Sequence, residues 1–324
     1  MKKSIGVCST VAFIMIICGF LSINGAWAAE KYPSHQIELL CGYPPGTGPD
    51  ILNRILGRYL EKQLGVTVIP VNKIGGGGVV AITTVATSRP DGYTLLNTGD
   101  YIIPVLTGQA GYAVEDLRVA AQVALNGAVL VVPADSPWKT FQDFINDAKK
   151  NPGTKYCHPG VNSVATMRME NLNKQANLKL INVTAQPDVV TIVLGKHVPI
   201  GLTANATAKP QVEAGRMRIL FSFDPPKGFG LDPTIPDFVS VFGKGVPDIE
   251  IAVYLAAQAK TPGDILQVLE KAMETISKDP EFINELSKNN FKASFLSGKT
   301  VMEEKIPVKM SLIKGILQSL ETTK

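Results

Sequence analysis

Residues 37–64 read IELLCGYPPGTGPDILNRILGRYLEKQL. The apolar run at 37–41 predicts a short buried β-strand. The loop after it leads to Pro49, and proline suits the first turn of a helix, where its missing N–H costs no hydrogen bond. Apolar residues then recur at the spacing of one helix face: Ile51, Leu52, Ile55, Leu56, Tyr59, Leu60 and Leu64. The segment is a strand–loop–helix unit that ends at Gly65, and such units build α/β folds.

The same arrangement recurs later in the chain. A predicted strand at 155–158 stops at PGVNS, residues 159–163, and a predicted helix runs to about Gln175. Further strands are predicted at 66–71, 93–96, 128–132, 180–183, 198–202 and 218–223, and further helices after Gly78 to about Ser88 and at 140–150, 264–278, 280–289 and 305–320. The alternation predicts an α/β fold with parallel-rich sheets, a surface segment at 223–247 and a mostly helical region from Pro262 onward.

Two loops follow predicted strands and precede predicted helices: residues 42–50, the first loop, and residues 157–163, the second loop. In open α/β sheets, ligands bind beyond the carboxyl ends of the strands. A helix that begins there presents unpaired N–H groups and a partial positive charge, which favour an anion. If the two loops belong to facing lobes, the sequence predicts an anion site between them.

The N-terminus has the pattern of an export signal. Lys2 and Lys3 precede an apolar run at 11–23, and Ala26-Trp27-Ala28 is a small-x-small cleavage site. An uncleaved anchor is the alternative, but the run is shorter than the roughly 20 residues that span a bilayer. We expect residues 1–28 to be a cleaved signal peptide and the mature protein to be periplasmic.

Composition excludes other classes of protein. The chain has 324 residues, 45% hydrophobic and 19% charged, which is typical of a globular protein of two domains. Its net charge is only +4 and no long basic run is present, so we expect no nucleic-acid partner. Cleavage would leave Cys41 and Cys157, either as a disulfide or, as we expect, as two buried thiols.

The sequence shows no catalytic or metal-binding motif. The histidines His35, His158 and His197 lack metal-ligand spacing, and there is no Gly-x-Ser-x-Gly motif. Residues 46–48 begin like a dinucleotide fingerprint, but Ile51 stands at the third glycine position. The glycine run at 75–78 lacks the Lys-Ser/Thr pair of a phosphate loop. We expect no enzymatic activity, no metal and no cofactor.

Several polar residues in or near the loops allow two interpretations. Asp50 either complements the helix dipole or shapes the first loop and receives a ligand donor. Asp100 is either a surface residue or a partner for a cationic or hydroxyl group of the ligand, and His158 is either solvated or in contact with ligand. Asn162 and Ser163 are good helix N-caps that can also touch the ligand.

A set of motifs spread over almost the whole mature chain resembles one family. The matching positions are Tyr32-Pro33 with Ile37, Tyr43-Pro44-Pro45-Gly46 with Asp50-Ile51 and Arg54, Asn72 with residues 75–78, residues 90–96, Asp116-Leu117, residues 130–132, Asn151-Pro152-Gly153, residues 160–163, Pro210 with residues 214–216 and Arg218, and Thr261-Pro262. Together they resemble the Bug-type extracytoplasmic solute receptors of tripartite tricarboxylate transporters.

The resemblance implies a two-lobed, type II-like periplasmic binding protein that closes on its ligand like a flytrap. Each lobe would be a mixed sheet flanked by helices, with the ligand in the interlobe cleft. We expect lobe 1 to comprise residues 30–125 and 222–324, and lobe 2 residues 126–221, joined by two or three crossover strands. A monomer is expected, because the lobes must move freely.

The implied function is capture of a small carboxylate (a di- or tricarboxylate, an acidic amino acid or an aromatic acid) for a membrane permease. A sensory receptor of the same fold is the alternative that sequence leaves open, and a secreted enzyme is disfavoured by the missing motifs. The implied ligand-binding residues are Tyr43, Pro45, Gly46, Thr47, Gly48, Asp50, Thr98, Gly99, Asp100, His158, Gly160, Val161, Asn162, Ser163, Gln186 and Thr203.

The sequence departs from the family pattern mainly at the second loop. Thr47 replaces a usual glycine in the first loop, and Cys157-His158-Pro159 replaces small hydroxyl or glycine residues. Residues 184–187 differ from the usual Pro-Tyr-Lys-Gly-Gly and are about two residues shorter, and Thr203 stands where an Asp is usual. We therefore expect a ligand that is unusual for the family.

Overall fold

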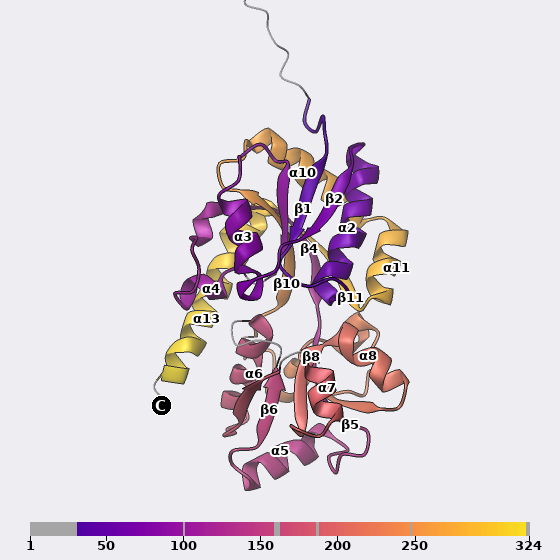
Figure 1. Ribbon diagram of the computed structural model, residues 1–324. Helices are drawn as coiled ribbons and strands as arrows, with labels where there is room; N and C mark the ends of the chain where they lie inside the picture. Colours follow the sequence, from indigo (N-terminus) through magenta and orange to yellow (C-terminus); the bar gives the residue numbers. More distant parts are fainter. Residues whose placement is uncertain (1–30, 100, 159–162, 186–187, 247, 322–324) are drawn as a thin grey trace, which may run out of the picture. The chain divides into compact units, whose positions relative to one another are not determined.

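The computed structural model describes residues 31–99, 101–158, 163–185, 188–246 and 248–321. The chain divides into two compact units, residues 1–34 and 35–324, and the second holds all the described strands and helices. These form two sheets, each with its own core (Figure 1).

The first sheet has the strand order β11-β4-β10-β3-β1-β2. Its strands are β1 (Ile37–Cys41), β2 (Val68–Asn72), β3 (Thr94–Thr98), β4 (Leu117–Asn126), β10 (Ile251–Gln258) and β11 (Phe291–Ser297). β1 is parallel to β2 and β3, whereas β10 is antiparallel to β3 and β4, and β11 is antiparallel to β4. The carboxyl ends of β1 and β3 therefore lie at one edge, and the first loop follows β1 there.

Helices pack on this sheet in two groups (Figure 1). The larger helices are α2 (Gly48–Leu64), α3 (Val79–Ala86), α10 (Gly263–Ser277), α11 (Pro280–Lys288) and α13 (Ile306–Glu321). The short ones are α4 (Ile103–Leu106), α12 (Gly298–Thr300), a π-helical turn (Val301–Lys305) and 3-10 turns at Gly76–Gly78 and Val114–Asp116. α2, α10 and α11 contact one another, while α3 and α13 share a core with β4 and β10.

The second sheet has the strand order β7-β6-β8-β5-β9. Its strands are β5 (Ala128–Pro133), β6 (Lys155–His158), β7 (Ile181–Thr184), β8 (Ile200–Ala204) and β9 (Met217–Ser222). The helices around it are α5 (Phe141–Lys150), α6 (Val164–Gln175), α7 (Val189–Leu194), α8 (Asn205–Glu213) and α9 (Phe238–Phe242), with a 3-10 turn at Pro226–Phe229. β5 buries alternate side chains in two cores, which explains its unbroken apolar sequence.

Two segments connect the sheets: Gly127, between β4 and β5, and residues 223–250, between β9 and β10. We call these the crossover segments. The lobe boundaries at 125/126 and 221/222 remain a prediction.

The structure corrects one expectation from sequence patterns and adds elements that were not predicted. The sheets are mixed, as the family resemblance implied, rather than parallel-rich. Strands β4, β10 and β11 were not predicted, and β11 interrupts the region expected to be mostly helical. The segment at 223–247 contains α9 and a 3-10 turn. In the part of the chain that the structure describes, no helix is both long and apolar enough to cross a bilayer.

Candidate functional site

Asp50 organises the first loop. Its Oδ2 accepts hydrogen bonds from the Gly46 N–H (2.9 Å) and from Arg54 Nε (3.0 Å), and its Oδ1 accepts one from Asn72 Nδ2 (2.7 Å). The same Asn72 nitrogen also donates to the carbonyl of Tyr43 (2.9 Å). Asp50, although only 2% exposed, is therefore held by the loop, by its own helix and by the end of β2.

This network sets the protonation of Asp50. Burial by itself would raise the pKa of the Asp50 carboxyl, but the bonds from Arg54, Gly46 and Asn72 outweigh burial and lower the pKa. Both carboxylate oxygens bind protein groups. Asp50 lies in the first turn of α2 and its bonds also shape the first loop, while its part in ligand binding stays a prediction.

The glycine run at 75–78 lies directly against the first loop. A Cβ added to Gly42 would stand 2.5 Å from the Cα of Gly78, and one added to Gly78 would stand 3.8 Å from the Tyr43 ring. Gly78 has φ 103°, a backbone conformation that L side chains rarely adopt. Sequence analysis only excluded this run as a phosphate loop. Its role is to let two backbones approach beside Tyr43.

Thr98 and Gly99 lie where β3 ends. Thr98 is buried and pairs with Tyr254 of β10, and a Cβ on Gly99 would stand 3.0 Å from the Ala252 carbonyl. The Gly99 carbonyl accepts a hydrogen bond from Lys309 Nζ of α13 (3.2 Å). Lys309 is only 7% exposed and was not predicted from sequence, because nothing in its helical surroundings distinguishes it from a surface lysine.

At the second loop, the structure describes both ends. His158 is fully buried at the end of β6 rather than solvated, and its Nδ1 lies 3.3 Å from Thr166 Oγ1. Ser163 is the N-cap of α6, because its Oγ accepts a hydrogen bond from the Thr166 N–H (3.2 Å). The predicted capping role of Ser163 is confirmed. Contact of His158 and Ser163 with a ligand stays a prediction.

The remaining predicted positions lie in β8, outside the described ranges, or in the first loop. Thr203 is a buried residue of β8, paired with Val129 of β5. The residues outside the described ranges are Asp100, Gly160, Val161, Asn162 and Gln186. Of the first-loop residues, Thr47 is the N-cap of α2, and its Oγ1 donates to the Pro44 carbonyl (2.6 Å).

Cys41 and Cys157 are free and buried, as expected. Burial raises the pKa of each thiol to about 11, so both remain protonated at neutral pH. They end up in separate sheets, in β1 and β6. Within the described ranges, no three His, Cys, Asp or Glu side chains group as a metal site.

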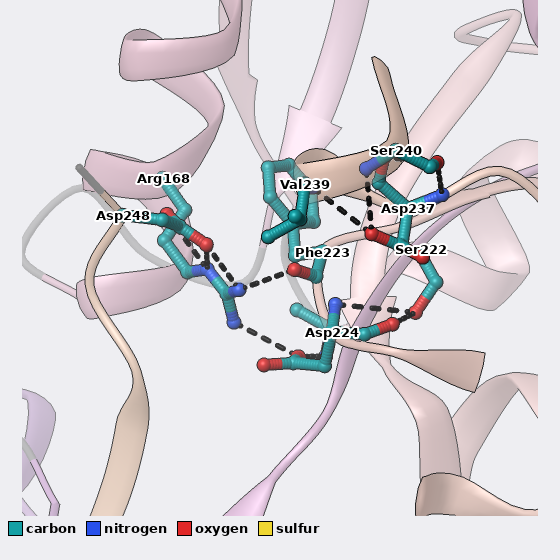
Figure 2. Close-up of polar contacts among 9 residues, drawn as sticks. Arg168, Ser222, Phe223, Asp224, Asp237, Val239, Ser240 and Asp248 are labelled. Carbon is teal, nitrogen blue, oxygen red and sulfur yellow. Dashed lines mark hydrogen bonds and ion pairs between the residues drawn. The ribbon is translucent and has the colours of Figure 1, made fainter. Parts of the chain in front are cut away.

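A buried ion cluster beside the crossover segments was not predicted. Figure 2 shows Arg168 reaching from α6 toward Asp248 and Asp224. Arg168 Nε lies 3.0 Å from Asp248 Oδ2, Nη1 lies 2.9 Å from Asp224 Oδ2, and Nη2 donates to the Phe223 carbonyl (2.7 Å). The guanidinium also lies over the Phe223 ring, 5.1 Å from its centroid. The signal in the sequence was a single arginine inside the buried stretch VATMRM at 164–169.

This cluster lines a cavity of about 620 Å³. The other polar residues around the cavity come from the first sheet (Gln122 and Tyr254), the crossover segment before β10 (Glu250), the π-helical turn (Glu304 and Lys305) and α13 (Lys309). None of the predicted first-loop residues lines it. The cavity and the first loop are therefore different parts of the molecule, and Lys309 lines the cavity and also bonds Gly99.

Comparison with known proteins identifies the family. The sequence model described as "Tripartite tricarboxylate transporter family receptor" matches residues 52–311. The chain belongs to this family. It is a solute-binding receptor of the Bug type, similar to Protein BugT of Bordetella pertussis, with 28% identity over 246 residues that cover 71% of this chain and 75% of BugT.

Solved structures show the same fold. The Rhodopseudomonas palustris protein Rpa4515, solved with adipate, superposes with a TM-score of 0.78 at 18% identity, covering 89% of this chain and 97% of that one. MatC from the same organism, solved with bound malate, has a TM-score of 0.70 at 19% identity, covering 90% and 99%. At these identities the likeness establishes the two-lobed α/β fold of periplasmic binding proteins and nothing finer. The family is one of transport receptors, not of enzymes.

Proposed function

We propose that this receptor captures a small carboxylate in the periplasm and delivers it to the membrane permease subunits of a tripartite transporter. The family match over residues 52–311 carries this proposal. The adipate and malate of the two related structures support a dicarboxylate as the first ligand to test. Export through a cleaved signal at 1–28 agrees with this location, and the receptor would act as a cofactor-free monomer.

The two loops are the proposed contacts with the ligand carboxylate. The first turns of α2 and α6 each begin at such a loop, and the first N–H groups of a helix have no intrahelical partner. Pro49 has no N–H, and the Gly46 N–H already donates to Asp50, so the backbone donors that the start of α2 can offer are the N–H groups of Gly48 and Asp50. At α6, Ser163 caps Thr166, which leaves the N–H groups of Val164 and Ala165 for a ligand.

The energetics of such a site need few contacts. A hydrogen bond to a charged ligand contributes about 1.5–3 kcal/mol. Micromolar binding corresponds to about 8 kcal/mol, so several such bonds suffice. The other predicted residues would set the specificity: Tyr43, Pro45, Thr47, Thr98, Gly99, His158, Thr203 and the second-loop residues Gly160, Val161 and Asn162. Closure of the two lobes would bury the ligand and produce the form that the permease recognises.

A thermal-shift screen tests this function. The mature protein, unfolded and refolded to strip carried-over ligand, is heated with adipate, malate, glutamate and nicotinate, and with adipamide, malamide, glutaminamide and nicotinamide, in which every carboxyl group is amidated. A ligand at a hundred times its Kd adds about 2.7 kcal/mol, which raises the Tm by several degrees. We expect at least one acid to raise the Tm while its amide does not. A response only to neutral compounds, or to none, would contradict carboxylate capture.

A further inference from the structure

Arg168 connects the helix of the second loop to both ends of the longer crossover segment, residues 223–250. It bonds Asp224 and the Phe223 carbonyl where the chain leaves β9, and it bonds Asp248 shortly before β10 begins (Figure 2). Asp224 also accepts a hydrogen bond from the Ala128 N–H (3.2 Å), next to Gly127. One side chain, 1% exposed, thus holds α6 against both ends of the longer crossover segment and, through Asp224, reaches the start of β5 after Gly127.

The cluster holds one positively charged side chain between two carboxylates, so its charges restrict its geometry. One guanidinium faces two carboxylates, so the group carries one net negative charge if all three are ionised. Burial by itself would lower the pKa of Arg168, but Asp224 and Asp248 raise it, so the guanidinium stays charged. Burial raises the pKa of Asp248 despite Arg168. Removing the charge of Arg168 would leave two buried carboxylates without compensation.

The bonded path continues to both parts of the proposed ligand site. Ser163, the N-cap of α6, lies five residues before Arg168, and the first turn of the helix lies between them. On the other side, Asp248 leads into β10, where Tyr254 pairs with Thr98 at the end of β3. The position of Arg168 therefore influences the second loop, and the position of Asp248 influences Thr98.

We propose that Arg168 is a positioning residue for ligand capture. It does not contact the ligand itself but, through α6, holds Ser163 and the first turn of that helix in register with Thr98 and Gly99. The proposal rests on the proposed function in that the ligand site lies at those residues. Without the cluster, α6 would sample more positions. The binding-competent arrangement would then be populated for less of the time, and the apparent affinity for the ligand would fall in proportion.

The test compares Asp248→Asn and Arg168→Lys with the control Tyr156→Phe. Asp248→Asn keeps the shape of the Asp248 side chain, the more exposed of the two carboxylates, and removes its negative charge. Arg168→Lys keeps the positive charge of Arg168 and loses the forked geometry of the guanidinium. Tyr156 donates to Glu170 of the same helix (2.7 Å) but reaches neither crossover segment through that bond. The control therefore disturbs a buried bond of α6 without touching the cluster.

Kd is measured by calorimetry at a temperature where circular dichroism shows each variant fully folded. The probe is the one of adipate, malate, glutamate and nicotinate that raises the wild-type Tm most. We expect Asp248→Asn to weaken binding about three- to thirtyfold and Arg168→Lys to weaken it less. Tyr156→Phe is expected to lower the Tm and leave the Kd unchanged. Wild-type Kd in Asp248→Asn, or equal weakening in Tyr156→Phe, would overturn the positioning role.

A second readout separates this inference from the proposed function. Amide hydrogen exchange of the ligand-free protein is measured at residues 163–168. We expect faster exchange there in Asp248→Asn and wild-type exchange in Tyr156→Phe. If the wild type binds none of the acids, the proposed function fails, while this arm still decides whether the cluster holds the start of α6. Unchanged exchange in Asp248→Asn would overturn the inference even if binding is found.

Discussion

Asp50 shows how one buried carboxylate can define a binding loop. It holds Gly46 and, through Asn72, the Tyr43 carbonyl, while Arg54 balances its charge. A carboxylate at the start of α2 is therefore compatible with an anion in the same loop, because its negative charge is already paired. Sequence could place Asp50 at the helix start but could not show its partner Asn72, which is 22 residues away and belongs to another strand.

Asp50→Asn is expected to lower stability in a pH-dependent way. The folded state lowers the pKa of Asp50 below its ordinary value of 3.8, so the ionised form stabilises the fold above that pH. This contribution is lost as the pH falls through the folded-state pKa. The Tm difference between wild type and Asp50→Asn should thus be clear at neutral pH and disappear in acid. A difference that stays constant across this pH range would contradict the assignment.

The same variant also tests whether Asp50 shapes the loop for a ligand. Asp143 is a matched control, since its carboxylate accepts bonds from the N–H groups of Lys139 and Thr140 at the start of α5. We expect Asp50→Asn to reduce both stability and ligand affinity, and Asp143→Asn to reduce stability alone. If Asp50→Asn lowers the Tm without changing the Kd, Asp50 serves only the helix.

Ser163→Ala separates a capping role from a ligand contact. Loss of the cap on α6 should cost about 0.5–2 kcal/mol. Thr140 caps α5 in the same way, away from both loops, so Thr140→Ala provides the matched control. We expect both variants to lose stability, and only Ser163→Ala to bind its carboxylate severalfold more weakly in calorimetry. Equal affinity in the two variants would remove Ser163 from the site.

At the scale of elements, the first loop depends on a close approach between two backbones. Gly42→Ala would place its Cβ 2.5 Å from the Gly78 Cα, so the loop must shift. Such overpacking costs typically about 1–3 kcal/mol. We expect lower stability and weaker carboxylate binding from Gly42→Ala. Gly111→Ala, where an added Cβ meets nothing within 4 Å, is the control. Wild-type affinity in Gly42→Ala would show that the loop position does not matter for the ligand.

The elements that sequence predicted well are the ones with a local signal. β1 and α2 were predicted because an apolar run, a proline and an αL glycine at position 65 mark their ends. α5 and α6 begin at capping residues that the sequence displays. The strands β4 and β10 were missed because alanines dilute their apolar runs, and alanine favours helix over strand. Their pairing in the sheet centre is a tertiary effect.

The candidate site was predictable only in part, for the same reason. The loops that follow β1 and β6 could be located from strand and helix patterns. The contact of Lys309 with Gly99 spans 210 residues, and the bonds of Arg168 to Asp248 span 80. Neither has a local signature, because each depends on how the C-terminal helix or a crossover segment folds back. Long-range hydrogen bonds and ion pairs of this kind become visible only in the folded structure.

For the molecule as a whole, the proposed function requires two sheets that each contribute one helix start to a shared ligand. The first sheet supplies α2 and the end of β3, and the second supplies α6. Each ligand loop directly follows a short, largely buried strand, β1 for the first loop and β6 for the second. Rigid strands and short loops are what a preorganised site requires.

Amide hydrogen exchange with and without ligand tests this central claim most directly. The ligand-stripped mature protein is compared alone, with the acid that raises its Tm most in the screen, and with the matching amide. We predict slower exchange at residues 42–50, 97–99 and 163–167 with the acid, and no change with the amide. Protection confined to the cavity around Arg168, or an equal response to acid and amide, would contradict carboxylate capture by the two loops.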